Sequence, residues 1–138
     1  MTPFVPLRIS SEYSISNSII RLQELVDQAR QYSMTALALT DQMNMFAAVK
    51  FYRLCRENGI KPILGVNALF QEEQSAKLHH LILLAKDEKG YLSLCRLLSR
   101  AYLRRGINKE PPHLDWSWLQ ELELSLIHIS EPTRLRRI

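Results

Sequence analysis

Polar side chains stand where the predicted strands of this chain end. The positions are Arg8, Ser10, Asp41, Gln42 and Asn67, together with His79 and His80 inside the last strand. In α/β folds the reactive groups gather at the carboxyl ends of strands, because loops vary there while the sheet holds them in place. Carboxylate and imidazole are metal ligands and the other groups form hydrogen bonds. The pattern therefore indicates a polar site at one edge of a sheet.

Each of these positions also has an ordinary structural role. Asp41 follows the apolar run TALALT and could cap the next helix, and His79 or His80 could be a partly buried strand histidine. Short motif matches carry a high false-positive risk. From the residues alone, the structural interpretation is favoured.

Apolar periodicity predicts the elements that must hold these positions. The expected order is strand, helix, strand, helix, strand, strand, helix, over residues 4–9, 19–32, 35–40, 46–58, 60–70, 78–86 and 90–104. We expect Asn17 or Ser18 to cap the first helix and Gly59 to end the second. A further short helix is expected at 115–122. This alternation is typical of an α/β domain with a largely parallel sheet.

Composition limits the class of protein. The chain has 138 residues, 46% hydrophobic and 23% charged, with a net charge of +4. These values fit one globular domain and argue against disorder. The apolar runs are shorter than the roughly 20 residues that span a bilayer, and the N-terminus lacks the pattern of a secretory signal. We therefore expect no membrane partner and a cytoplasmic location.

Three segments carry a resemblance to a known family. They are FVPLRISSEYS at 4–14, MTALALTDQMNMFAAVKFYRLCRENGIKPILGVN at 34–67 and HHLILLAKDEKGYLSLCRLLSRAYL at 79–103. In order and spacing they closely resemble the N-terminal PHP (polymerase and histidinol phosphatase) domain of bacterial DNA polymerase III alpha subunits. The resemblance implies an α/β fold, the N-terminal part of an incomplete PHP-type distorted (β/α) barrel, in residues 1–124.

The resemblance also implies a degenerate metal site. Active PHP members hold two or three divalent metals with histidines and carboxylates, and a metal-bound water attacks a phosphoester. Here Arg8 and Ser10 replace the His-x-His motif, Gln42 follows Asp41 in place of histidine, and Asn67 replaces a glutamate. Asp41 and His80 keep ligand-type side chains. We expect no catalytic residue and no bound metal.

Arg8 cannot be a metal ligand, because a guanidinium has donors only. It can take the space and charge of a lost cation. We therefore predict that Arg8 pairs with Asp41, with Gln42 and Asn67 filling the remaining hydrogen bonds.

The resemblance implies partners for the intact protein. They are a proofreading exonuclease, for which the PHP domain is a docking surface, a sliding clamp and other replicase subunits, and DNA bound through other domains. Magnesium is expected in the polymerase domain and no cofactor in this fragment. Two alternatives remain: a free-standing metal-dependent phosphoesterase of the histidinol-phosphatase type, and a non-catalytic interaction module that only binds an exonuclease.

Two further features have competing interpretations. Arg96, Arg100, Arg104 and Arg105 recur along the predicted helix at 90–104 and just beyond it. They could face phosphates, although the solvated face of an amphipathic helix is favoured. The segment SLIHISEPTR from Ser125 resembles a translated sequencing-library adapter, so we predict that residues 125–138 are a non-native tail.

Overall fold

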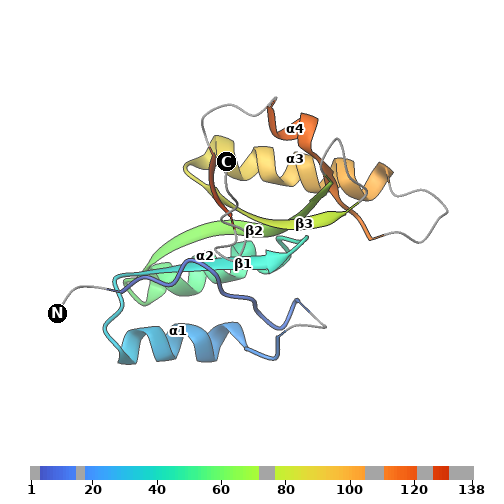
Figure 1. Ribbon diagram of the computed structural model, residues 1–138. Coiled ribbons are helices and arrows are strands. Elements are labelled where there is room, and N and C mark those ends of the chain that lie inside the picture. The colour runs from blue at the N-terminus through green and yellow to red at the C-terminus, as the bar shows by residue number, and fades with distance from the viewer. Residues whose placement is uncertain (1–3, 15–17, 72–76, 105–110, 121–125, 131–138) are drawn as a thin grey trace.

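A twisted five-stranded mixed sheet with helices against it forms the frame of the molecule (Figure 1). The computed structural model describes residues 4–14, 18–71, 77–104, 111–120 and 126–130. Its elements are α1 (Leu22–Gln31), β1 (Ala36–Gln42), α2 (Ala48–Glu57), β2 (Lys61–Gln71), β3 (Leu78–Ala85), α3 (Glu88–Arg104), β4 (Leu114–Asp115), α4 (Trp116–Gln120) and β5 (Leu126–Ser130). The predicted α/β class is confirmed, and its three main helices and the strands β1, β2 and β3 lie within a few residues of their expected places.

The sheet has the strand order β1-β2-β3-β5, and β4 pairs with the far end of β2. β1 and β2 are parallel, whereas β3 is antiparallel to both β2 and β5. The expectation of a largely parallel sheet is therefore wrong. A parallel connection needs a crossover of a dozen or more residues. Too few residues separate β2 from β3 for such a crossover, and the two strands pair antiparallel.

The predicted first strand, over residues 4–9, is also wrong. The segment runs along β1 (Figure 1) and is tied to it at Ile9. The Thr40 backbone N–H donates to the Ile9 carbonyl at 2.7 Å, but the Ile9 N–H donates to the Thr40 hydroxyl at 3.2 Å. Pro6 has no N–H to donate. A regular ladder therefore does not form.

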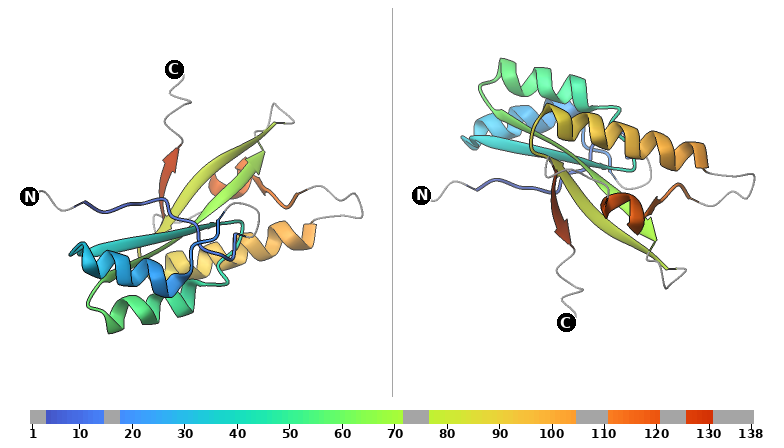
Figure 2. Two further views of the ribbon diagram at one scale, coloured as in Figure 1. Left: turned by 90° about the horizontal axis from the view of Figure 1, so that it is seen from below. Right: turned by 90° about the horizontal axis from the view of Figure 1, so that it is seen from above.

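Alternation along the strands sends one set of side chains toward the helices. Figure 2 shows α1, α2 and α3 on the same side of the strands. Leu37 and Leu39 of β1 pack with α1 and α2, whereas Val66 of β2 and Leu83 of β3 pack with α3 in a second cluster.

The cluster with α1 and α2 also contains the Cys55 thiol. Burial raises the pKa of this thiol to about 11, so the side chain stays neutral at ordinary pH.

The C-termini of α1 and α2 have the same hydrogen-bonding motif. After α2, the Ile60 N–H donates to the Cys55 carbonyl and the Gly59 N–H to the Arg56 carbonyl, which is a Schellman motif. Gly59 has the left-handed φ of 70° that the motif requires, so the predicted stop is confirmed. After α1, Ser33 takes the equivalent position with a φ of 55°.

The start of α1 differs from the prediction. The N-cap is Arg21, which makes no side-chain capping bond. The Ser18 hydroxyl lies three residues before this N-cap; it donates to the Ser10 carbonyl at 2.7 Å and accepts the Ile20 N–H at 3.2 Å. Asn17 lies outside the described residues.

The described part of the C-terminal region has two short strands and a short helix. Of the predicted helix at 115–122, α4 covers Trp116–Gln120, Asp115 belongs to β4, and residues 121–122 lie outside the described residues. β5 pairs with β3 from Leu81↔Ser130 to Ala85↔Leu126, inside the segment that we assign to a non-native tail. That assignment stays a prediction. No helix in the described parts of the chain is long and apolar enough to cross a membrane.

We predict that Ser33→Gly raises the free energy of unfolding by about 0.5 kcal/mol, because glycine adopts a left-handed backbone without the cost of a Cβ. The matched change Gly59→Ala should lower it by about 1 kcal/mol. An added Cβ at Gly59 meets no atom within 4 Å, so only the backbone conformation is tested. Urea denaturation measures both changes, and a destabilising Ser33→Gly would contradict the interpretation.

Candidate functional site

The buried carboxylate of Asp41 is the centre of the polar contacts at the end of β1. Its side chain is 1% exposed. One oxygen accepts the Ser11 backbone N–H at 2.6 Å and the Ser14 hydroxyl at 2.8 Å, and the other accepts the Ser11 hydroxyl at 2.7 Å. Hydrogen bonds to an ionised group contribute about 1.5–3 kcal/mol each. We call Ser11, Ser14 and Asp41 the Asp41 cluster.

The Asp41 cluster also fixes the backbone on both sides of the contact. The Ser14 hydroxyl accepts the Gln42 N–H at 3.1 Å, and the Ser11 hydroxyl accepts the Tyr13 N–H at 3.2 Å. The turn is closed by the Ser14 N–H, which donates to the Ser11 carbonyl. The chain thereby passes around the end of β1, from the edge of the sheet toward α1.

A second polar group lies on the other face of the sheet. Gln42 of β1 is in register with Asn67 of β2. Two residues further along the same face of β2, Leu69 is in register with His80 of β3. The Asn67 Oδ1 and the His80 Nδ1 are 3.1 Å apart. Because an amide oxygen only accepts, His80 donates from Nδ1. We call Gln42, Asn67 and His80 the amide–histidine group.

Asp41 does not belong to this group. Its neighbour in register is Val66, a residue of the core between the sheet and α3. Successive side chains of a strand point to opposite faces, so Asp41 and Gln42 point apart. The structure thus brings together three of the predicted site residues and separates Asp41 from them.

The predicted pairing of Arg8 with Asp41 differs from the contacts found. Among the described residues, the donors to Asp41 are Ser11 and Ser14, and the Arg8 side chain is exposed. Arg8 lies on the segment along the edge of β1, before the chain turns toward Asp41. Ser10 is half-buried and contributes its backbone carbonyl to Ser18.

The loop after β1 is held by residues that the sequence analysis did not identify. Met43 has a left-handed φ of 51°, its N–H donates to the Asn67 carbonyl, and its carbonyl accepts the Tyr102 hydroxyl at 2.9 Å. The Asn44 amide donates to the carbonyls of Tyr13 and Gln42. Apart from the contact of Asn44 with Gln42, two residues before it, these contacts join segments far apart in the chain, and nothing in the local sequence marks them.

The residues present do not fit the metal centre that the resemblance implies. Both oxygens of Asp41 are used by serine donors on the helix side of the sheet. The amide–histidine group supplies one imidazole and two neutral amides, which are weak partners for divalent metals. No group of three or more histidine, cysteine, aspartate or glutamate side chains suited to a metal occurs in the described ranges.

Comparisons with known proteins agree on one family. The model of the PHP domain matches residues 6–135. DNA polymerase III subunit alpha of Chlamydia trachomatis is 43% identical over 108 residues, 72% of this chain and 9% of that protein. The subunit of Borreliella burgdorferi is 37% identical over 133 residues, 90% and 11% of the two chains. This chain therefore spans about a tenth of the length of these relatives.

Solved structures support the same fold. A protein of Bifidobacterium adolescentis named as a metal-dependent phosphoesterase has a TM-score of 0.59 and 15% identity, over 76% of this chain and 35% of that one. An amidohydrolase of Chromobacterium violaceum has a TM-score of 0.57 and 21% identity, over 73% and 34%.

We predict that Ser14→Ala lowers the free energy of unfolding by about 2 kcal/mol, because it removes one donor to Asp41 and leaves the Gln42 N–H without its acceptor. Ser99→Ala is the matched control, since Ser99 is exposed on α3, and it should change stability by less than about 0.5 kcal/mol. Chemical denaturation compares the two variants. Equal effects would contradict the role given to the Asp41 cluster.

Proposed function

The chain belongs to the PHP domain family, and we propose that it is the N-terminal PHP module of a replicative DNA polymerase III alpha subunit. The proposal is supported by relatives of that name at 35–43% identity over most of the chain. In the intact protein, template-directed DNA synthesis with magnesium would belong to the polymerase domains. Its location would be the cytoplasm.

Within such a protein we propose a docking role for this module rather than hydrolysis. The observation that carries this proposal is the division of the candidate site. Asp41 is a hydrogen-bond acceptor within the fold, and the opposite face offers Gln42, Asn67 and one imidazole. A hydrolase of this family needs metals to generate its nucleophile. The partner we propose is the proofreading exonuclease, with the sliding clamp and DNA bound through other domains.

The alternative is a free-standing phosphoesterase of the histidinol-phosphatase type. The likeness to the two solved hydrolases concerns the fold alone. The replaced ligands at Arg8, Ser10, Gln42 and Asn67 argue against this alternative. Whether the chain binds a divalent metal ion therefore distinguishes the phosphoesterase from the docking module.

We predict that the chain binds no Mn²⁺ at millimolar concentration in calorimetry. The combined variant Arg8→His, Ser10→His, Gln42→His and Asn67→Glu should bind Mn²⁺ detectably under the same conditions, because it introduces imidazole and carboxylate ligands. Mn²⁺ binding by the unmodified chain that is lost with His80→Ala but kept with His113→Ala would instead favour the phosphoesterase.

A separate experiment tests docking. The full chain, immobilised in EDTA, should bind the isolated proofreading exonuclease of the same bacterium in a saturable manner, because the proposed contact needs no metal. Surface plasmon resonance measures the binding, with an unrelated protein of similar net charge as the control. Absence of binding at about 100 μM, where even weak contacts of roughly 5 kcal/mol are detected, would contradict the docking role.

A further inference from the structure

The side of α2 that points away from the core combines apolar and positively charged side chains. α2 packs against α1 and β1 through Phe51 and Cys55, and it lies at the outside of the molecule (Figure 2). Six exposed residues, one of them in the turn before the helix, form what we call the α2 face: Phe46, Val49, Lys50, Tyr52, Arg53 and Arg56. Their spacing of three and four residues places them next to one another on one side of the helix.

Three residues of the α2 face expose apolar surface. Phe46 is 75% exposed, Val49 is 63% exposed and Tyr52 is 47% exposed, and each is three residues from the next. The turn that carries Phe46 is fixed by the buried Asn44 side chain, which accepts the Phe46 N–H at 3.4 Å and donates to two backbone carbonyls. Exposed aromatic side chains in fixed positions are typical of protein interfaces.

The cations of the α2 face have no ionic partner in the chain as far as it is described. There, Lys50, Arg53 and Arg56 form no ion pair, and neither does Glu57, the acidic residue at the end of the same helix. The Arg56 guanidinium carbon lies 6.0 Å from the centroid of the Tyr52 ring, a contact that leaves its charge in place. Three cations beside one carboxylate attract anions, and guanidinium groups bind carboxylates in a bidentate manner.

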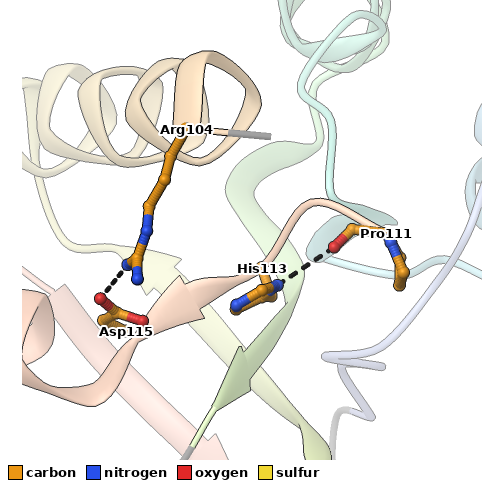
Figure 3. A network of polar contacts seen from close by, with 4 residues as sticks. All are labelled: Arg104, Pro111, His113 and Asp115. Atoms are coloured by element: carbon orange, nitrogen blue, oxygen red, sulfur yellow. Dashed lines mark hydrogen bonds and ion pairs between the residues drawn. The ribbon is translucent and has the colours of Figure 1, made fainter. Parts of the chain in front are cut away.

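The arginines of α3 differ, because contacts within the chain engage two of them. Arg104 pairs with Asp115 of β4 (Figure 3). The Arg100 and Arg104 guanidinium carbons lie 4.2 Å and 5.3 Å from the centroid of the Trp118 ring. The arginine series for which the sequence favours a solvated helix face is thus partly held by its own chain, and Arg105 lies outside the described residues. We therefore look to α2 for the cations that a partner can use.

A pocket beside the α2 face provides room for an apolar side chain of a partner. It has a volume of about 420 Å³ and lies between α2 and the start of α3. Most of its lining is apolar or aromatic: Tyr52, Pro62, Leu64, Ala85 and Tyr91. Lys86, Asp87 and Glu88 complete the lining, and Asp87 already accepts the Gly90 N–H at 2.9 Å. Because Tyr52 belongs to both the α2 face and the pocket, the exposed apolar stripe leads into the pocket.

A helical protein segment fits the α2 face better than a nucleic acid does. A nucleic acid strand would bring its phosphates against Phe46 and Val49 when it approached the cations. An amphipathic helix carries carboxylates and apolar side chains at the same spacing of three and four residues that α2 has. Such a helix makes both kinds of contact at once.

We propose that the α2 face binds an acidic amphipathic helix of a partner protein. The carboxylates of the helix pair with the three cations of the face. Its apolar side chains pack on Phe46 and Val49, and one of them enters the pocket beside Tyr52. The inference rests on the proposed docking function for the identity of the partner, and on the α2 face for the chemistry of the segment.

The test uses synthetic peptides and the full chain. A fluorescein-labelled helical peptide with glutamate and leucine on adjoining faces should bind, as measured by fluorescence polarisation. Arg53→Glu should weaken binding about tenfold or more, because it reverses one of the three charges. Val49→Ser should weaken binding several-fold, because it removes apolar contact area. The matched controls are Arg96→Glu and Leu103→Ser, two exposed positions on α3, which should leave the affinity unchanged.

Four results would overturn the proposal. They are no binding of the acidic peptide at millimolar concentration, equal binding of a peptide with lysine in place of glutamate, equal binding of a scrambled peptide that cannot form an amphipathic helix, and equal losses in Arg53→Glu and Arg96→Glu. A dT20 oligonucleotide that binds more tightly than the acidic peptide, with Val49→Ser without effect, would also overturn it and assign the α2 face to nucleic acid. Because the exonuclease is absent from this experiment, its failure is distinguishable from failure of the docking experiment above.

Discussion

A buried carboxylate must be matched by hydrogen-bond donors, and the path of the chain through Ser11 and Ser14 meets that requirement for Asp41. An unmatched charge at 1% exposure would cost several kcal/mol. Two hydroxyls and one backbone N–H provide the match, and to reach Asp41 the chain must bend at Ser11 and Ser14. The bend leads the chain from the edge of β1 to α1, which covers the core beneath the sheet.

The strand ends are joined by hydrogen bonds where metal-bearing members of the family are expected to use ions. Met43 links β1 to β2 through its N–H and to α3 through its carbonyl. Asn67 and His80 link β2 to β3. Metal ligands must be deprotonated, whereas the contacts of Met43 use only backbone groups and the Tyr102 hydroxyl. In the described residues, the strand ends are thus held together by groups of the protein itself.

Sequence periodicity predicted the elements well and the site only in part. The helices and central strands follow from apolar spacing, which local residues determine. The sequence pattern ends the second strand at Thr40, whereas β1 continues to Gln42. These two extra residues decide the site, because alternation then sends Asp41 and Gln42 to opposite faces. The roles of Ser11 and Ser14 depend on contacts with Asp41 about thirty residues away, which no local pattern encodes.

The contacts among β1, β2 and β3 involve only the part of the chain that ends at Ala85. Ser11 meets Asp41, Ala36 pairs with Lys61, and Gly65 pairs with Leu84, whereas β4 and β5 pair with strands much earlier in the chain. Domains begin to fold from the N-terminal side during synthesis. During synthesis on the ribosome, the sheet of β1, β2 and β3 can therefore assemble before β4 and α4 have emerged from the exit tunnel.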